Sequence, residues 1–176
     1  MMMIELVKKL AGLLKLKDLF FENMEAHRLV AMDVPKEFNV EVNYSAEGRR
    51  RSERAFDAIA TFVATMNGLD SPVARVACTI RVVFVLPDNE QTREVQLTDE
   101  LVNALAETQG IYTAHPYFRE YLHGASGRLA LPPLLAPHLT GKSLFDRVRD
   151  REAKKAEVKP DVKATNVVSI KPSKAS

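Results

Sequence analysis

The sequence has few of the features that mark secreted, membrane or disulfide-stabilised proteins. Its single cysteine, Cys78, excludes an internal disulfide, and no apolar run approaches the roughly 20 residues that span a bilayer. The first 21 residues mix apolar side chains with lysines and lack the apolar stretch and cleavage site of a signal peptide. We therefore expect a cytoplasmic protein with no stable membrane insertion.

Catalytic and metal-binding motifs are also missing. The four histidines, His27, His115, His123 and His138, do not have the spacing of a metal site. No serine or cysteine lies beside a histidine in a recognisable nucleophile motif, and no pair of carboxylates stands out. The sequence therefore predicts a protein that is not an enzyme and that uses neither a metal nor another cofactor.

One segment matches a loose phosphate-binding loop, residues 136–143, with the sequence APHLTGKS. Such a loop follows a strand. Pro132, Pro133 and Pro137 exclude a strand here, because proline fixes φ and has no N–H to donate. We expect instead a turn that leads into the last helix, with Ser143 as its N-cap.

The net charge of +2 conceals two unlike parts of the chain. Residues 147–176 hold nine Lys/Arg and four Asp/Glu, whereas residues 1–146 hold sixteen and nineteen. A mildly acidic body therefore precedes a basic tail. No aromatic residues are interleaved with the basic ones in this tail or in the arginine cluster 49–51, so nucleic acid is not an expected partner.

Alternation of apolar and polar residues predicts four strands, and a helical pattern follows them. The expected strands are residues 13–21, 38–44, 54–66 and 76–86, with a bulge near Asp18 where the alternation slips by one residue. Hairpin-length links, such as the turn signal Asn67-Gly68, favour an antiparallel meander with Cys78 on its apolar face.

Two longer helices are expected after the strands. Thr98 and two acidic residues mark the start of the first, which continues to about His123, where Gly124 and Gly127 end it. A charged helix follows at residues 144–158. Strands first and helices afterwards predict an α+β fold.

The proline-rich segment between these helices has an unusual composition. Residues 131–137 read LPPLLAP, and their three prolines exclude both a helix interior and a central strand. An apolar loop must cover something, either the protein's own core or a bound guest.

Three motifs together resemble the SecB family of bacterial export chaperones. Residues 17–23, KDLFFEN, are similar to the family's first-strand signature K-D-[ILM]-S-F-E-N. Residues 116–120, PYFRE, are similar to F-P-Y-A-R-E of the long helix, and residues 131–137 to F-P-P-L-x-L-A-P of the connecting loop. The resemblance covers residues 13–150. Residues 1–12 would be an N-terminal extension containing a short helix, and residues 151–176 a basic tail that we expect to be disordered.

The resemblance implies an ATP-independent holdase that assembles as a homotetramer, a dimer of dimers. Client polypeptides, such as unfolded preproteins, would bind in apolar grooves between the sheet, the connecting loop and the last helix. The implied groove residues are Phe56, Phe62, Ile80, Phe84, Leu131, Leu134 and Leu135. For the four residues of the sheet, an ordinary buried core is the alternative that the sequence favours, because any sheet buries such an apolar face. The implied interface residues of the long helix are Leu101, Leu105, Tyr112, Tyr117, Arg119 and Glu120.

Two departures from the family pattern leave the biological role open. Phe20 replaces the serine of the first signature, and the tail is basic where the family's tail is acidic. Asp18 and Glu22 match acidic positions that contact the translocation ATPase SecA in the family. The chain is therefore either a general holdase for export, with SecA as a possible partner, or a binding module for one specific partner such as an antitoxin.

Overall fold

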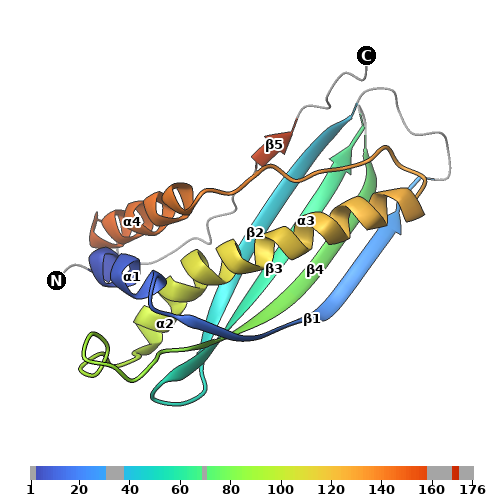
Figure 1. The fold of residues 1–176 in the computed structure, drawn as a ribbon. Helices are drawn as coiled ribbons and strands as arrows, with labels where there is room; N and C mark the ends of the chain where they lie inside the picture. The colour runs from blue at the N-terminus through green and yellow to red at the C-terminus, as the bar shows by residue number, and fades with distance from the viewer. Residues whose placement is uncertain (1–2, 31–37, 69–70, 158–167, 171–176) are drawn as a thin grey trace.

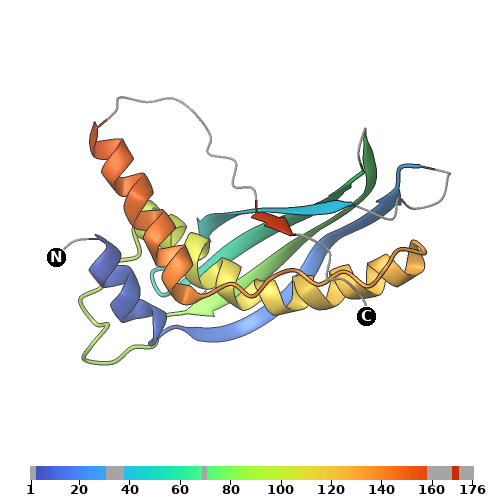
Figure 2. The ribbon, with the colours of Figure 1, turned by 90° about the horizontal axis from the view of Figure 1, so that it is seen from above.

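A computed structural model describes residues 3–30, 38–68, 71–157 and 168–170. The helices lie on one face of a long twisted sheet (Figures 1 and 2). Of the tail for which we expected disorder, residues 158–167 and 171–176 lie outside the described residues. The expectation is wrong for residues 151–157, which continue the last helix, and for residues 168–170, which form a short strand. Residues 31–37, which join the first two strands, are also outside them.

The sheet confirms the α+β class and the four antiparallel strands. These are β1 (Lys15–Arg28), β2 (Asn39–Arg50), β3 (Ala55–Asn67) and β4 (Pro72–Val85), and a short β5 (Val168–Ile170) adds to β2. The strand order is β1-β4-β3-β2-β5. The predicted meander is therefore wrong for β1, which pairs with β4 rather than β2 and gives a Greek-key order. Alternation shows which residues form strands, but it does not show which strands pair.

The strands lie where the sequence predicts them, but β1 runs on from the expected end at Phe21 to Arg28, and β4 begins four residues early at Pro72. The predicted bulge is confirmed, since the register of β1 against β4 shifts between Leu16 and Asp18. A second shift lies between Phe21 and Asn23. β2 is also longer than predicted, since it extends beyond Tyr44 to Arg50 and includes Arg49 and Arg50 of the arginine cluster.

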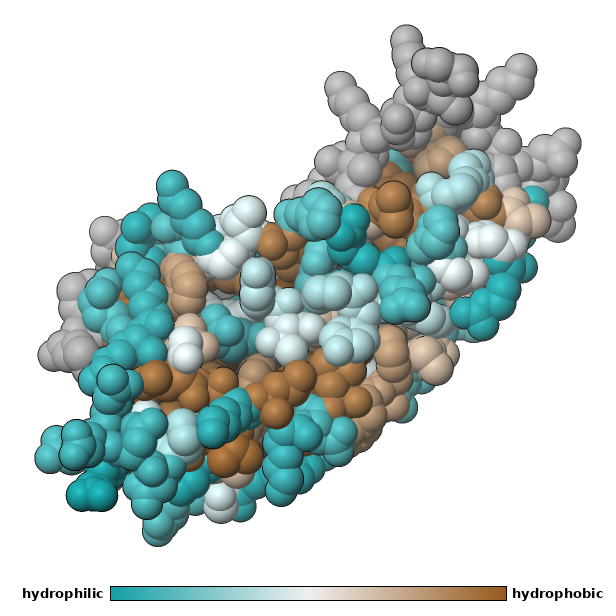
Figure 3. All heavy atoms as spheres, viewed as in Figure 1, coloured by the Kyte–Doolittle hydropathy of each residue, from teal (hydrophilic) through white to brown (hydrophobic). Residues whose placement is uncertain are grey.

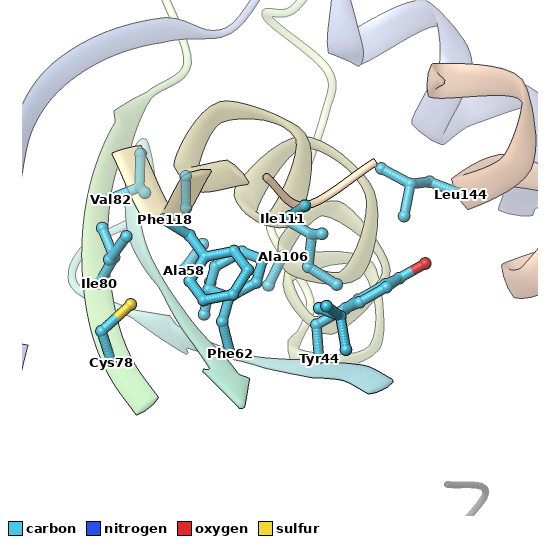
Figure 4. Close-up of a cluster of buried hydrophobic side chains, with 14 of the residues drawn as sticks. Tyr44, Ala58, Phe62, Cys78, Ile80, Val82, Ala106, Ile111, Phe118 and Leu144 are labelled. Atoms are coloured by element: carbon cyan, nitrogen blue, oxygen red, sulfur yellow. The ribbon is translucent and has the colours of Figure 1, made fainter. Parts of the chain in front are cut away.

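The core lies between the sheet and a long helix. The even-numbered positions of β3 are buried on the helix face, as predicted. The Phe62 ring stacks on Phe118 of the helix with 4.7 Å between ring centroids (Figure 4). Cys78 is a buried core residue, and its burial raises the pKa of the thiol to about 12, so the thiol stays protonated.

The long helix consists of α2 (Asp99–Leu105), a π-helical segment η1 (Ala106–Gly110) and α3 (Ile111–Arg128). The Thr98 cap is confirmed, since its side chain accepts a hydrogen bond from the Leu101 N–H. The prediction that Gly124 and Gly127 end the helix is wrong. The helix continues to Arg128, and the chain turns back at Ala130, which has a positive φ of 53°.

The hydrogen bonds at this end explain why the glycines are not needed as terminators. The Leu131 N–H donates to the Ser126 carbonyl and the Ala130 N–H donates to the Gly127 carbonyl. This pair of bonds is the Schellman motif, and it places Ala130 at the position where glycine is usual.

Two glycines, Gly110 of the long helix and Gly48 of β2, allow the helix and the sheet to approach closely. A Cβ at Gly110 would lie 2.5 Å from the Cβ of Ala58, and one at Gly48 would lie 2.5 Å from the Val102 carbonyl oxygen. The Gly48 N–H also donates to Asn103 Oδ1 over 2.9 Å. Only glycine fits at these two points of contact.

Two further helices lie at one end of the sheet (Figure 1). α1 (Met3–Ala11) buries Ile4, Val7 and Leu10 in the same core, and α4 (Gly141–Glu157) buries Leu144 and Val148. α4 begins earlier than predicted, and the cap is Thr140 rather than Ser143: the Ser143 N–H donates to Thr140 Oγ1. None of the helices in the described ranges has the length and apolar character to span a membrane.

Candidate functional site

The connecting segment, residues 131–140, contains no helix or strand, as its prolines predict. It runs back along the long helix from the end of α3 to the start of α4 (Figures 1 and 2). Arg119 Nε donates to the Ala136 carbonyl over 2.8 Å, and the Leu134 N–H donates to Ser126 Oγ over 3.3 Å. Polar side chains of α3 therefore hold this irregular segment in one place.

The leucines of the connecting segment point in two directions. Leu131 and Leu134 are each only 6% exposed, and Ala136 is buried as well. Leu135 is 58% exposed. The segment therefore covers the protein's own core and also presents a large apolar side chain to the outside.

Cationic side chains lie on both sides of the segment. Arg119 Nη1 donates to the His138 ring, with Nδ1 at 3.0 Å. The Arg147 guanidinium of α4 lies 4.3 Å above the Tyr44 ring of β2, which joins the last helix to the sheet by a cation–π contact. Arg119 thus binds the connecting segment within this chain, whereas the resemblance implied a role between chains.

His115 lies beneath the segment in the aromatic core. It is 5% exposed, and its ring is 6.1 Å from that of Phe62 and 6.3 Å from that of Phe118. Burial, followed by the nearby Arg119 and His138, lowers the pKa of His115 to about 4. The imidazole is therefore neutral near pH 7, and we assign it to the core.

The structure corrects several groove and interface assignments. Phe56, Phe62, Ile80 and Phe84 are buried beneath the long helix, so they offer no open surface to a client. Leu101 and Leu105 are also buried, so they are not free to meet a second copy. Both corrections have the same physical reason, because one apolar sheet face and one apolar helix stripe cover each other.

Leu131 and Leu134 of the implied groove are buried as well, whereas four of the assigned residues keep an open surface. Leu135 does so in the connecting segment, and Tyr112, Tyr117 and Glu120 do so along α3. The structure therefore leaves one groove residue and three interface residues of the implied sets accessible. Their roles stay predictions.

Sequence reasoning missed the exposed apolar side chains of β1 and of the residue that follows it. Leu16 and Met24 lie opposite Phe84 and Cys78 on the helix side of the sheet, whereas Phe20 lies opposite Arg81 on the other face. These three residues and Leu29 are all exposed. Figure 3 shows apolar side chains gathered below the long helix, where the chain passes from α1 into β1. The slip in alternation near Asp18 was the available signal, because each bulge moves the following side chains to the other face of a strand.

The face of the sheet away from the helices is rich in ion pairs. Asp57 is buried, with its Oδ1 atom 2.6 Å from Arg51 Nε and its Oδ2 atom 3.4 Å from Arg81 Nη1. Arg81 also pairs with Glu22 and lies over the Phe20 ring at 5.7 Å. Phe20, the departure from the family serine, therefore has a defined contact here.

The two acidic positions implied to contact SecA differ in their surroundings. Both are exposed, but Glu22 forms an ion pair with Arg81, whereas Asp18 accepts a hydrogen bond from the Leu19 N–H over 2.8 Å. No cluster of three or more His, Cys, Asp or Glu side chains suited to a metal ion occurs within the described ranges.

Comparison with known proteins finds similarity to SecB-like chaperones. No family model matches the chain. Two curated proteins of Mycobacterium tuberculosis, the SecB-like chaperones Rv1957 and MT2006, are each 48% identical to it over 44 residues. This match covers 25% of the chain and 24% of each relative, so the chain spans about a quarter of the length of the curated relatives.

A solved structure extends the likeness to most of the fold. It is the Mycobacterium tuberculosis Rv1957 SecB-like chaperone in complex with a ChAD peptide from the Rv1956 HigA1 antitoxin. The TM-score is 0.66 at 22% identity, and the match covers 77% of this chain and 97% of that one. The motif resemblance is therefore matched by related proteins, and the chain shares the fold of the Rv1957 SecB-like chaperone.

Proposed function

We propose that this protein is an ATP-independent chaperone that binds extended, unfolded segments of other polypeptides. The observation that carries the proposal is the connecting segment, which presents Leu135 while α3 holds its backbone through Arg119 and Ser126. A segment already held in place loses little entropy when it binds. Contact through apolar burial also makes few demands on the client's sequence.

A dedicated binding module is the second candidate. The SecB-like chaperone with the similar fold was solved with an antitoxin peptide, which supports a single polypeptide partner for this chain too. For an export role the support is narrower: Asp18 is exposed, whereas Glu22 is in an ion pair and the tail is basic. We therefore place a specific partner ahead of SecA-dependent export of preproteins, and propose that the protein acts in the cytoplasm.

The first experiment measures suppression of aggregation by light scattering, with a chemically denatured test protein and no ATP. We expect the wild type to suppress scattering near stoichiometric amounts. Leu135→Asp should weaken client binding about tenfold or more, because burying a leucine contributes about 1.5–3 kcal/mol. Leu29→Asp is the matched control, since Leu29 is about as exposed but lies at the end of β1.

Two outcomes would contradict the proposal. Unchanged scattering at stoichiometric wild-type protein would refute chaperone activity, and equal losses in both leucine variants would refute the assignment to the connecting segment. Capture from lysate then separates the two candidates. One dominant partner supports the dedicated module, and many unrelated partners support the general chaperone.

A further inference from the structure

The short strand β5 occupies the edge of β2. It pairs antiparallel with Val168 opposite Val42, Ser169 opposite Glu41 and Ile170 opposite Val40. On its other side β2 pairs with β3 along its length, so β5 takes up the outer edge. An edge strand presents unpaired N–H and C=O groups, which are a template for any extended chain.

The edge of β2 that β5 occupies lies close to α4 and the connecting segment. Val40 and Val42 are buried on the helix face, and the next residue on that face, Tyr44, lies under Arg147 of α4. Figure 1 shows β5 on the same side of the sheet edge as the connecting segment. An extended chain paired with β2 here would therefore run close to α4 and the connecting segment.

β5 is short enough for another extended segment to replace it at the edge of β2. β5 contains three residues, whereas β2 contains twelve, so most of β2 extends beyond it. The sequence around it, VVSI, is rich in β-branched residues, and Pro172 follows closely. Backbone hydrogen bonds in such a pair do not depend on side-chain identity, so a different extended segment can replace it.

We propose that the edge of β2 at Val40–Val42 is a strand-pairing site for extended polypeptide, and that the chain's own residues 168–170 occupy it until a client displaces them. This inference rests on the proposed chaperone function and adds a site and a competitor to it. The tail then lowers the apparent affinity for clients by the fraction of molecules in which the edge is open.

The test compares Ser169→Pro with Ser173→Pro in the full-length chain. Proline at position 169 removes an N–H and restricts φ within β5, whereas position 173 lies beyond the pairs that the structure describes. The probe is reduced, carboxymethylated α-lactalbumin, which stays unfolded in buffer. We expect Ser169→Pro to bind it about threefold to tenfold more tightly than the wild type, and Ser173→Pro to match the wild type.

Amide hydrogen exchange reports whether residues 168–170 remain paired with β2. In the wild type, adding the probe to saturation should remove protection from residues 168–170 and keep it at residues 40–42. Ser169→Pro should lose protection at 168–170 without the probe.

Three results would overturn the inference: equal affinities in Ser169→Pro and the wild type, tail amides that stay protected when the probe is bound, or tail amides that are unprotected in the free wild type. A failure of the chaperone proposal looks different, because then no variant binds the probe at all.

Discussion

Burial determines the protonation of His115, whose ring lies near those of Phe62 and Phe118. Its pKa falls from 6.5 to about 4 in the folded protein. Between these two pH values the unfolded chain takes up a proton that the folded chain does not. The free energy of unfolding should therefore fall as the pH is lowered from 6.5 to 4, by up to about 3 kcal/mol from this group.

Urea unfolding at a series of pH values between 4.5 and 7.5 measures this slope. His115→Gln should flatten the slope in this window, because the replaced side chain does not titrate. His123→Gln should keep the wild-type slope, since His123 is exposed. An unchanged slope in His115→Gln would show that other groups cause the acid sensitivity.

Ala130 is a second residue whose surroundings determine its effect on stability. Its φ of 53° is unfavourable for any residue with a Cβ. Ala130→Gly should therefore stabilise the protein by about 0.5–1 kcal/mol, measured by thermal or urea unfolding. Ala153→Gly, at an exposed position inside α4, should destabilise it by a similar amount. The same sign for both changes would contradict the Schellman assignment.

The long helix packs closely against β3 because Gly110 has no side chain. Gly110→Ala would place a Cβ 2.5 Å from that of Ala58, so one of the two elements must move. We expect a loss of about 1–3 kcal/mol in the free energy of unfolding.

Gly124→Ala in the same helix is the control. A Cβ at Gly124 has no neighbour within 4 Å, and we expect a gain of up to about 1 kcal/mol from helix propensity. Tolerance of alanine at position 110 would mean that the π-helical segment does not touch β3 as described.

The sequence predicted single elements correctly where interactions between residues close together in the chain determine them. Alternation located β3, the capping signal located the start of the long helix at Thr98, and three prolines kept residues 131–137 irregular. The end of that helix did not follow, because the hydrogen bonds that close it depend on how the connecting segment turns back, and not on where glycines occur.

At the scale of the whole molecule, the exposed apolar residues predict self-association. Leu16, Phe20 and Met24 are exposed on β1, which pairs with β4 alone among the described strands, and Tyr112 and Tyr117 are exposed on α3. The resemblance to the SecB family implies four copies, so we expect a homotetramer of about four times 19.7 kDa in solution.

Native mass spectrometry and light scattering measure this mass. Tyr112→Asp combined with Tyr117→Asp should lower it, whereas Leu29→Asp should not, because Leu29 lies outside the implied interface helix. A wild-type monomer at micromolar concentration would refute the tetramer, and a tetrameric double variant would refute the assignment to this face of α3.

The sequence alone located the four long strands, though not all of their ends, the apolar stripe of the long helix and the irregular segment, because these properties depend on neighbours a few positions apart. Only the tertiary structure decided that β1 joins β4, that four phenylalanine and isoleucine side chains assigned to a client are covered by the long helix, and that Leu135 stays exposed. These outcomes depend on which distant surfaces meet, and residue periodicity carries no information about the partner of an apolar face.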